Sequence, residues 1–342
     1  MPVKNLKPIN LALQGGGSHG AFTWGVLNRL LEDTRIEIKS VSGVSSGAMN
    51  ACVLASGLIN GGREGAKEAI ATFWNAVADK YHDLFESHPA TIWNKAVGFD
   101  YPVPLDTYLS LTENFSPYQL NPFNLNPLRD ILIRFVDFEQ LRKNSSIKLY
   151  IGATQVRTGK MRVFTNEEIG VDVLLASACL PSLHHAIEIE GEHYWDGGYS
   201  GNPPLFPLIF NSDHPDILVV LLQPLLRDSV PTTVDEIRKR THELSFTNTF
   251  LREMRAIALS KEEIKQEWLY SGSLEKRMRR LNIHMIEDAE FEKMDSSSRY
   301  YAGSDFIQDL YLRGFETTDN WLSKHYRSIT KRSSIDLVKL FA

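Results

Sequence analysis

The pattern of apolar and polar positions predicts alternating strands and helices over the first sixty residues. Residues 9–13 form a short apolar run that ends in glycines, as expected for a buried strand and a tight turn. Apolar positions then recur at spacings of one, three and four over residues 22–31, which is typical of a helix. Residues 36–41 alternate like a strand, and residues 48–55 predict a helix that ends at Gly57. Strands separated by helices imply βαβ units and a parallel sheet.

The rest of the chain continues this mixture. Its strongest signal for a buried strand is the unbroken apolar run at residues 217–222. Beyond that run the chain is mostly helical in pattern and charged, with one further candidate strand at residues 282–286. The remaining expected elements are helices over 128–135 and 171–180, a strand over 147–153 and a hairpin over 187–195.

Regular periodicity is lost from about residue 81 to residue 127, where prolines and aromatic residues are interleaved. Two interpretations of this segment remain open: a structured insertion that packs on the core, or a cap that faces lipid. We expect one domain over residues 9–209 that carries this insertion. A C-terminal extension over residues 210–342, with one strand and then mostly helices, is expected to pack on that domain.

Composition fits a globular protein whose main partner is not nucleic acid. The chain has 342 residues and is 43% hydrophobic, so it can bury a core without disulfides or metals. A formal charge of −5 argues against nucleic acid as a partner. Cys52 and Cys179 lie in apolar surroundings, which predicts buried thiols in a reducing compartment. With no signal peptide and no run long enough to span a membrane, we expect a cytoplasmic protein, in contact with a membrane surface at most.

Two basic clusters stand out in this acidic chain. Such clusters can bind an anionic membrane surface, although a solvated helix face is the commoner explanation. The first consists of Lys276, Arg277, Arg279 and Arg280, and the second of Lys324, Arg327, Lys331 and Arg332.

The sharpest chemical motif is the pentapeptide from Gly43 to Gly47, which fits G-x-S-x-G between a predicted strand and a predicted helix. That context is typical of a nucleophile elbow. Gly43 and Gly47 would let strand and helix approach closely while Ser45 is held on a sharp turn. The N-terminus of the following helix would then direct its backbone N–H groups at developing negative charge.

A second glycine motif has two competing interpretations. The run Gly15-Gly16-Gly17-Ser18-His19-Gly20 fits G-x-G-x-x-G after a strand, so a dinucleotide site is one of them. Such a site needs an acidic residue near the end of the next strand, and Glu37 stands at its start instead. The other interpretation is an oxyanion hole for a tetrahedral intermediate formed at Ser45. We favour the oxyanion hole because the elbow is adjacent.

A serine nucleophile needs a base, and Asp196 is the best candidate. It ends a predicted strand and is followed by Gly197 and Gly198, which would present its carboxylate at the rim of the sheet. The pair His184-His185 has no acidic or cysteine partner at metal-ligand spacing, so no metal site is expected. None of the histidines after the elbow follows a convincing strand in a glycine-rich loop: His214, His242, His284 and His325.

The glycine loop, the serine elbow and the Asp-Gly-Gly turn, in this order, resemble the patatin-like phospholipase family over about residues 9–209. Bacterial members with a helical C-terminal extension look similar to the remainder. The resemblance implies a three-layer α/β/α fold with a mainly parallel sheet, and a Ser-Asp dyad that acts on lipid or lysolipid esters without cofactor or metal. Ser45 would be the nucleophile, Asp196 the base, and residues 15–18 the oxyanion hole. His19 departs from the pattern, because many members carry Arg or Lys there.

The leading hypothesis is therefore a serine lipid acyl hydrolase that forms an acyl-enzyme. The alternatives are a nucleotide-binding module that uses the glycine loop, and a lipid-binding protein without activity. The sequence leaves headgroup, chain length and oligomeric state open.

Overall fold

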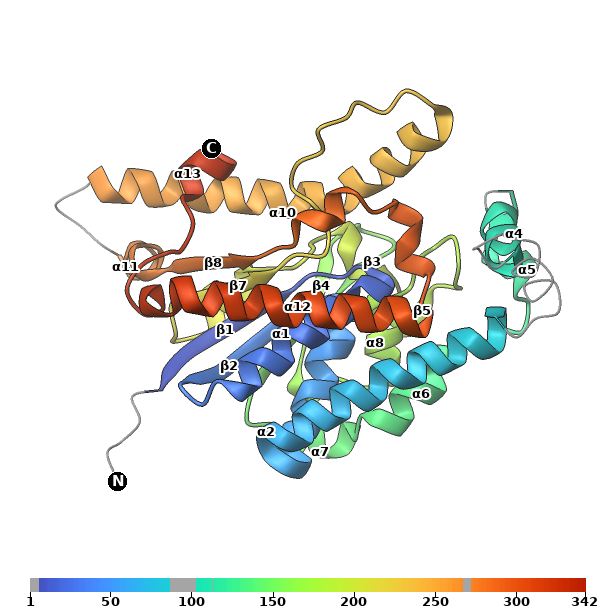
Figure 1. Ribbon diagram of the computed structural model, residues 1–342, viewed down its shortest axis with the longest axis horizontal. Coiled ribbons are helices and arrows are strands. Elements are labelled where there is room, and N and C mark those ends of the chain that lie inside the picture. The colour runs from blue at the N-terminus through green and yellow to red at the C-terminus, as the bar shows by residue number, and fades with distance from the viewer. Residues whose placement is uncertain (1–5, 87–102, 113, 267–271) are drawn as a thin grey trace.

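An eight-stranded sheet organises the computed structural model, which describes residues 6–86, 103–112, 114–266 and 272–342 (Figure 1). The strand order is β5-β6-β3-β2-β1-β7-β8, and β4 pairs separately with β3. The five strands in the spatial order β3-β2-β1-β7-β8 are parallel to one another. Strands β4 and β6 pair with β3 in antiparallel fashion, and β5 pairs with β6 in the same way. The strands are β1 Lys7–Leu13, β2 Ile36–Gly43, β3 Lys148–Gln155, β4 Met161–Thr165, β5 Ile187–Ile189, β6 Glu192–Asp196, β7 Asp216–Val220 and β8 Asn282–Ile286.

Alternate side chains of the strands enter two different cores. Leu11 and Leu13 pack into a large cluster with helices on one face of the sheet, and Ala12 between them joins a smaller cluster on the other face. Leu218 and Ile217 divide between the two clusters in the same way. Such alternation is what a sheet with helices on both faces requires. The three-layer α/β/α fold is therefore confirmed.

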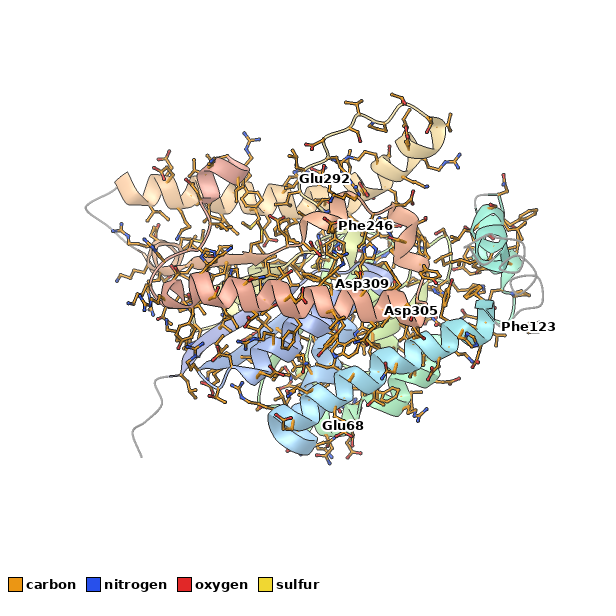
Figure 2. The ribbon with its side chains drawn as sticks, in the orientation of Figure 1. Glu68, Phe123, Phe246, Glu292, Asp305 and Asp309 are labelled. Atoms are coloured by element: carbon orange, nitrogen blue, oxygen red, sulfur yellow. The ribbon has the colours of Figure 1, made fainter. Side chains whose placement is uncertain are left out.

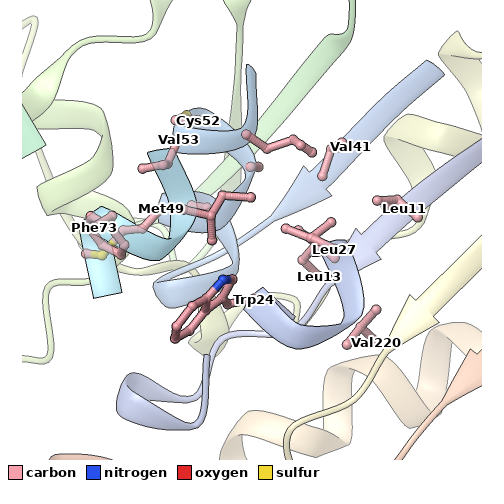
Figure 3. Close-up of a cluster of buried hydrophobic side chains, with 14 of the residues drawn as sticks. Leu11, Leu13, Trp24, Leu27, Val41, Met49, Cys52, Val53, Phe73 and Val220 are labelled. Atoms are coloured by element: carbon pink, nitrogen blue, oxygen red, sulfur yellow. The ribbon is translucent and has the colours of Figure 1, made fainter. Parts of the chain in front are cut away.

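The larger core holds helices from both ends of the chain. Figure 3 shows Leu13 and Val220 of neighbouring strands beside Leu27 and Met49 of the first two long helices. This face carries α1 Gly20–Glu32, α2 Ser46–Tyr81, α6 Pro127–Phe135, α7 Phe138–Asn144, α8 Val171–Ser177 and α12 Ser304–His325, and the other face carries α9 Phe206–Asn211, α10 Val234–Gln266, α11 Ser273–Arg280 and α13 Leu337–Phe341.

The segment after residue 209 shares the sheet and the core. Strands β7 and β8 extend the parallel part of the sheet beyond β1. Helix α12 lies along α1, where the rings of Trp24 and Tyr311 are 4.1 Å apart and Asn28 Nδ2 donates to Tyr311 Oη at 2.7 Å. No helix in the described ranges is both long and apolar enough to cross a bilayer.

The predicted end of the second helix at Gly57 is a few residues too early. The helix continues past Gly57 to a kink at Gly61 and Gly62, whose backbone angles are non-helical, and a second helical segment of α2 runs from there to Tyr81. A Cβ atom at Gly57 would lie 2.5 Å from Ala66 Cα, so this glycine serves a close contact within α2 across the kink rather than a helix end. Strand β4 was not predicted from the sequence, and α8 ends three residues before its predicted end at residue 180.

The described part of the insertion has apolar side chains that pack on the core and others that are exposed. It contains the π-helical turn His82–Glu86, α4 Val103–Thr112 and α5 Pro117–Leu120, while residues 87–102 and 113 lie outside the described chain. Leu105 is buried against the large core. Phe123 and Leu125 are 84% and 70% exposed, and Phe123 lies at the outer edge of the molecule in Figure 2.

Candidate active site

Ser45 lies on the tight turn that joins β2 to α2. Its φ of 53° is in the left-handed region, which is strained for a residue with a side chain. The turn is held by the Ser45 amide, which donates to the carbonyl oxygen of Ser177 at 3.1 Å and to its Oγ at 2.9 Å. Helix α2 begins at the next residue, so its N-terminus adjoins the Ser45 side chain. This is the strained strand-turn-helix geometry expected of a nucleophile elbow.

The glycines that support the motifs lie where two segments approach. A Cβ atom at Gly43 would lie 2.8 Å from the carbonyl carbon of Gly47, and one at Gly15 would lie 2.7 Å from Ser45 Cβ. A Cβ atom at each of the other four motif glycines would likewise come too close to a neighbour: Ser46 for Gly20, the Leu13 carbonyl for Gly47, the Gly152 carbonyl for Gly197 and the Phe246 ring for Gly198.

Asp196 is brought to Ser45 by the last position of β6. It pairs with Ala153 of β3, and its side chain is 1% exposed. The Gly198 amide donates to its Oδ1 at 2.7 Å. Burial raises the pKa of Asp196 to about 7, although the Gly198 amide, the Ser45 hydroxyl and the charge of Arg299 each act to lower it. A carboxylate with a pKa near neutrality is suited to accept and return a proton at neutral pH.

The glycine loop follows β1 and runs beside Ser45, but not all of its amides are available to a substrate. The Gly15 amide donates to Asn202 Oδ1 at 2.7 Å, and the Gly16 amide donates to Ser46 Oγ at 3.1 Å. Gly17, with a φ of 59°, begins a 3₁₀ turn, η1, over Gly17–His19. Among the described residues, no acceptor is hydrogen-bonded to the amide of Gly17 or to that of Ser18. These two are therefore the better candidates for oxyanion donors.

His19 in this loop is buried and neutral. Its Nε2 lies 2.7 Å from Ser298 Oγ, and its ring lies 5.1 Å from that of Phe291. Burial, assisted by the charge of Arg299, lowers its pKa to about 3. The side chain therefore carries no charge at neutral pH, and it fastens the loop to the C-terminal part of the chain.

A cavity of about 400 Å³ opens over Ser45, Asp196 and the glycine loop. This volume lies within the usual range for sites that bind small molecules. Its walls are mainly apolar, and they come from α2, α4 and α6, among them Phe73, Trp74, Val77, Leu105, Leu128 and Ile131. The cavity suits a hydrocarbon chain better than a nucleotide.

Glu37 cannot serve a dinucleotide in the glycine loop. It is the second residue of β2, paired with Pro8, and its carboxylate lies 2.7 Å from Lys39 Nζ. At roughly 3.3 Å per residue, the six residues to Gly43 place it about 20 Å from the end of the strand where the loop lies. No group of residues able to hold a metal ion occurs in the described ranges. His185 Nε2 instead lies 3.1 Å from the carbonyl oxygen of Pro117.

Three residues of this site were not predicted from the sequence. Asn202 holds the Gly15 amide, Ser177 holds the Ser45 amide, and Arg299 lines the cavity from the C-terminal part of the chain. Only Asn202 could have been suspected from the sequence, because it follows the Asp-Gly-Gly turn closely. Nothing in the local sequence of Ser177 or Arg299 points to the site. Cys52 and Cys179 are buried and free, as predicted.

Comparison with known proteins gives one extended match in sequence. Residues 11–209 match the sequence model of a family described as patatin-like phospholipase. No curated protein matches the chain. Among solved structures, the chain is similar to VipD from Legionella pneumophila, with 16% identity, a TM-score of 0.41 and coverage of 94% of this chain and 67% of that one. It is also similar to the ExoU–SpcU complex from the type III secretion system of Pseudomonas aeruginosa, with 16% identity, a TM-score of 0.40, and coverage of 94% of this chain but only about half, 52%, of the other.

Proposed function

The chain belongs to the patatin-like phospholipase family of lipid hydrolases, and from that premise we propose that Ser45 and Asp196 are its catalytic dyad. The observation that carries the proposal is that Ser45, on its strained turn, and the buried Asp196 line the same apolar cavity together with the glycine loop. The near-neutral pKa of Asp196 supports its role as the base.

In the first half of the proposed reaction, Ser45 Oγ attacks the carbonyl carbon of a lipid ester and Asp196 accepts the hydroxyl proton. The amides of Gly17 and Ser18 stabilise the oxyanion of the tetrahedral intermediate. When the intermediate collapses, the bond to the leaving alcohol breaks and Asp196 returns its proton to that oxygen. The acyl group remains on Ser45.

In the second half, water attacks the acyl-enzyme and Asp196 accepts a proton from it. The second tetrahedral intermediate then releases the fatty acid, and the proton returns to Ser45 Oγ. The apolar walls of the cavity bind the acyl chain, which makes a phospholipid or a lysophospholipid the proposed substrate. The reaction needs no group beyond this chain and water.

Contact with a lipid surface is proposed through the apolar rim of the insertion, defined here as Phe115, Tyr118, Phe123 and Leu125. These side chains are between 47% and 84% exposed, and Leu125 also lines the cavity. The first basic cluster lies on α11 and is called the α11 cluster here. Helix α11 lies at the opposite end of the molecule from α4 and α5 in Figure 1. A bilayer held by the α11 cluster would therefore not face the cavity, so the apolar rim is the better candidate.

Labelling with a fluorophosphonate probe, followed by peptide mass spectrometry, tests the nucleophile. We expect modification at Ser45, and activity against a panel of phospholipids and lysophospholipids that is lost in proportion to labelling. Active protein labelled elsewhere, or not labelled, would refute the dyad. A lipid-binding protein without activity would bind the panel without turnover, and a nucleotide-binding module would instead bind NAD or ATP.

A further inference from the structure

Gln223 is an almost buried polar residue at the same end of the sheet as Ser45. It lies three residues after the end of β7, and it lines the active-site cavity although it is only 6% exposed. Its backbone amide donates to Gln14 Oε1 at 3.0 Å, and Gln14 immediately precedes the glycine loop. A Cβ atom at Gly16 of that loop would lie 3.0 Å from Leu222 Cβ, so the two segments are in contact. Gln223 therefore lies beside the loop.

The side-chain amide of Gln223 is held by α10. The Thr247 hydroxyl donates to Gln223 Oε1 at 2.9 Å, and Thr247 is itself 6% exposed. The same hydroxyl lies 3.0 Å from the carbonyl oxygen of Glu243, one turn earlier in α10, which fixes its position. Because Oε1 is turned towards Thr247, the two N–H groups of Nε2 form the other end of the amide.

The Nε2 atom of Gln223 is a donor without an acceptor. Among the described residues, the hydrogen bonds of Gln223 are made by its backbone amide and by Oε1. The polar side-chain atoms that are fully enclosed without a partner, in the part of the chain that the structure describes, lie on other residues. Nε2 is therefore unpaired and accessible.

A substrate can reach Gln223 only from the active-site cavity. Gln223 also borders a small hollow behind the glycine loop, but its volume of about 10 Å³ leaves room for one water molecule at most. The active-site cavity, of about 400 Å³, is lined by Gln223 together with Ser45 and Asp196.

Gln223 belongs to the wall of the cavity that adjoins Asp196, and not to the apolar wall. Phe246, which precedes Thr247 on α10, also lines the cavity, and its ring would overlap a Cβ atom at Gly198. The Gly198 amide in turn donates to the Asp196 carboxylate at 2.7 Å. In the proposed reaction Asp196 returns its proton to the leaving alcohol, whereas the acyl chain occupies the wall of α2, α4 and α6. The alcohol is therefore the part of the substrate that Gln223 can reach.

We propose that Gln223 determines specificity for the leaving alcohol, because its Nε2 donates a hydrogen bond to an oxygen atom of the glycerophosphate group of a phospholipid or lysophospholipid. This inference rests on the proposed Ser-Asp dyad, and it names the part of the substrate that the dyad leaves open. An almost buried amide discriminates strongly, because a substrate without the acceptor leaves the amide unpaired in a dry site.

The other amide side chains that line the cavity serve the insertion. Asn121 holds a turn there, since its Nδ2 and Oδ1 are both bonded to the backbone of Leu125. Asn126 accepts from the Leu128 amide and caps α6. Gln223 alone among these three is anchored between the glycine loop and α10, where the leaving alcohol is expected.

Two esters of one fatty acid test the proposal: palmitoyl lysophosphatidylcholine and ethyl palmitate, presented in the same detergent micelles. They share the acyl chain and differ in the alcohol, so the measured quantity is the ratio of their kcat/KM values. We expect Gln223→Met, which keeps the length of the side chain, to lower this ratio about tenfold, because only the lysophospholipid loses a hydrogen bond. Gln308→Leu is the matched control on an exposed position of α12, and it should leave the ratio unchanged.

Thr247→Val tests the orientation of the amide. Valine keeps the shape of threonine but cannot hold Oε1, so the ratio should fall in the same direction and by less than in Gln223→Met. Monopalmitoylglycerol then identifies the acceptor. A loss confined to the lysophospholipid assigns the phosphate, and a loss shared by monopalmitoylglycerol assigns a glycerol hydroxyl; both results support the proposal.

An unchanged ratio in folded Gln223→Met, or equal losses with both esters, would overturn the proposal. If Gln223→Met fails to fold, Thr247→Val decides: a lowered ratio supports the role of Gln223, and an unchanged one refutes it. Ser45→Ala separates this inference from its premise. Hydrolysis by folded Ser45→Ala means that the dyad is wrong, whereas an inactive Ser45→Ala with an unchanged ratio in Gln223→Met removes the role of Gln223 alone.

Discussion

Replacing Asp196 by Asn should abolish catalysis and at the same time stabilise the fold above neutral pH. The carboxyl group is buried and hydrogen-bonded to the Gly198 amide at 2.7 Å. Asn has nearly the same shape, and its side-chain oxygen can accept the same hydrogen bond. It cannot accept a proton from Ser45, so the change removes the base while it keeps the packing.

The size of the gain follows from the shifted pKa. Burial raises the pKa of Asp196 from its ordinary value of 3.8 to about 7 in the folded protein. At about 1.4 kcal/mol per pKa unit, the ionised group lowers the free energy of unfolding by about 4 kcal/mol above pH 7. Below about pH 4 the carboxyl is protonated in both states and this cost disappears. Between these limits the cost grows with pH, because only the unfolded chain has released the proton.

Urea unfolding of the wild type and of Asp196→Asn at about pH 5 and pH 8.5 measures this difference. We expect the advantage of the Asn variant to grow by about 2 to 3 kcal/mol between the two conditions. Asp213→Asn is the matched control: Asp213 is exposed, so its replacement should leave the free energy of unfolding unchanged at either pH. An advantage that does not change with pH, or a wild type that is the more stable protein at pH 8.5, would refute the reasoning about burial.

Three further outcomes follow from the site. Ser45→Ala should abolish ester hydrolysis, whereas Ser46→Ala should keep much of it, because the buried Ser46 hydroxyl only accepts a hydrogen bond from the Gly16 amide. If Ser46→Ala were the inactive variant in the ester assay and Ser45→Ala the active one, the nucleophile would be misassigned. Replacing any single histidine by Gln, His242 included, should reduce esterase activity less than Asp196→Asn does. A folded histidine variant without activity would indicate a Ser-His-Asp triad. Phe123→Ser combined with Leu125→Ser should reduce flotation with phosphatidylcholine vesicles more than Ser substitutions in the α11 cluster do, and the opposite result would exclude the apolar rim.

The sequence predicted those parts of the fold and site that depend on neighbours in the chain. The elbow around Ser45 and the turn after Asp196 could be recognised because a strand, a sharp turn and small residues leave a local pattern. The three layers were predictable for the same reason, since alternation and helical periodicity are local signals. The end of the helix after Ser45 could not be predicted in this way. In the sequence alone Gly57 looks like a helix end, whereas in the folded protein it allows a close contact with Ala66.

Contacts between distant segments left no such pattern. The Gly15 amide is held by Asn202, and the glycine loop rests on residues near Arg299, yet neither contact follows from periodicity or spacing. The same holds for the cavity, whose walls come from separate helices and from an insertion without regular periodicity. Whether the amides of Gly15 and Gly16 are available to an oxyanion also depends on these tertiary contacts.

The requirements of the proposed substrate and of the proposed base are in conflict. An acyl chain binds well only in a dry, apolar cavity, but the same dryness disfavours an ionised Asp196. A histidine base would avoid the conflict, because it is neutral before it accepts a proton. An aspartate base must instead be kept ionised inside the dry cavity by groups that stabilise its negative charge, and here the Gly198 amide donates a hydrogen bond to the Asp196 carboxylate at 2.7 Å.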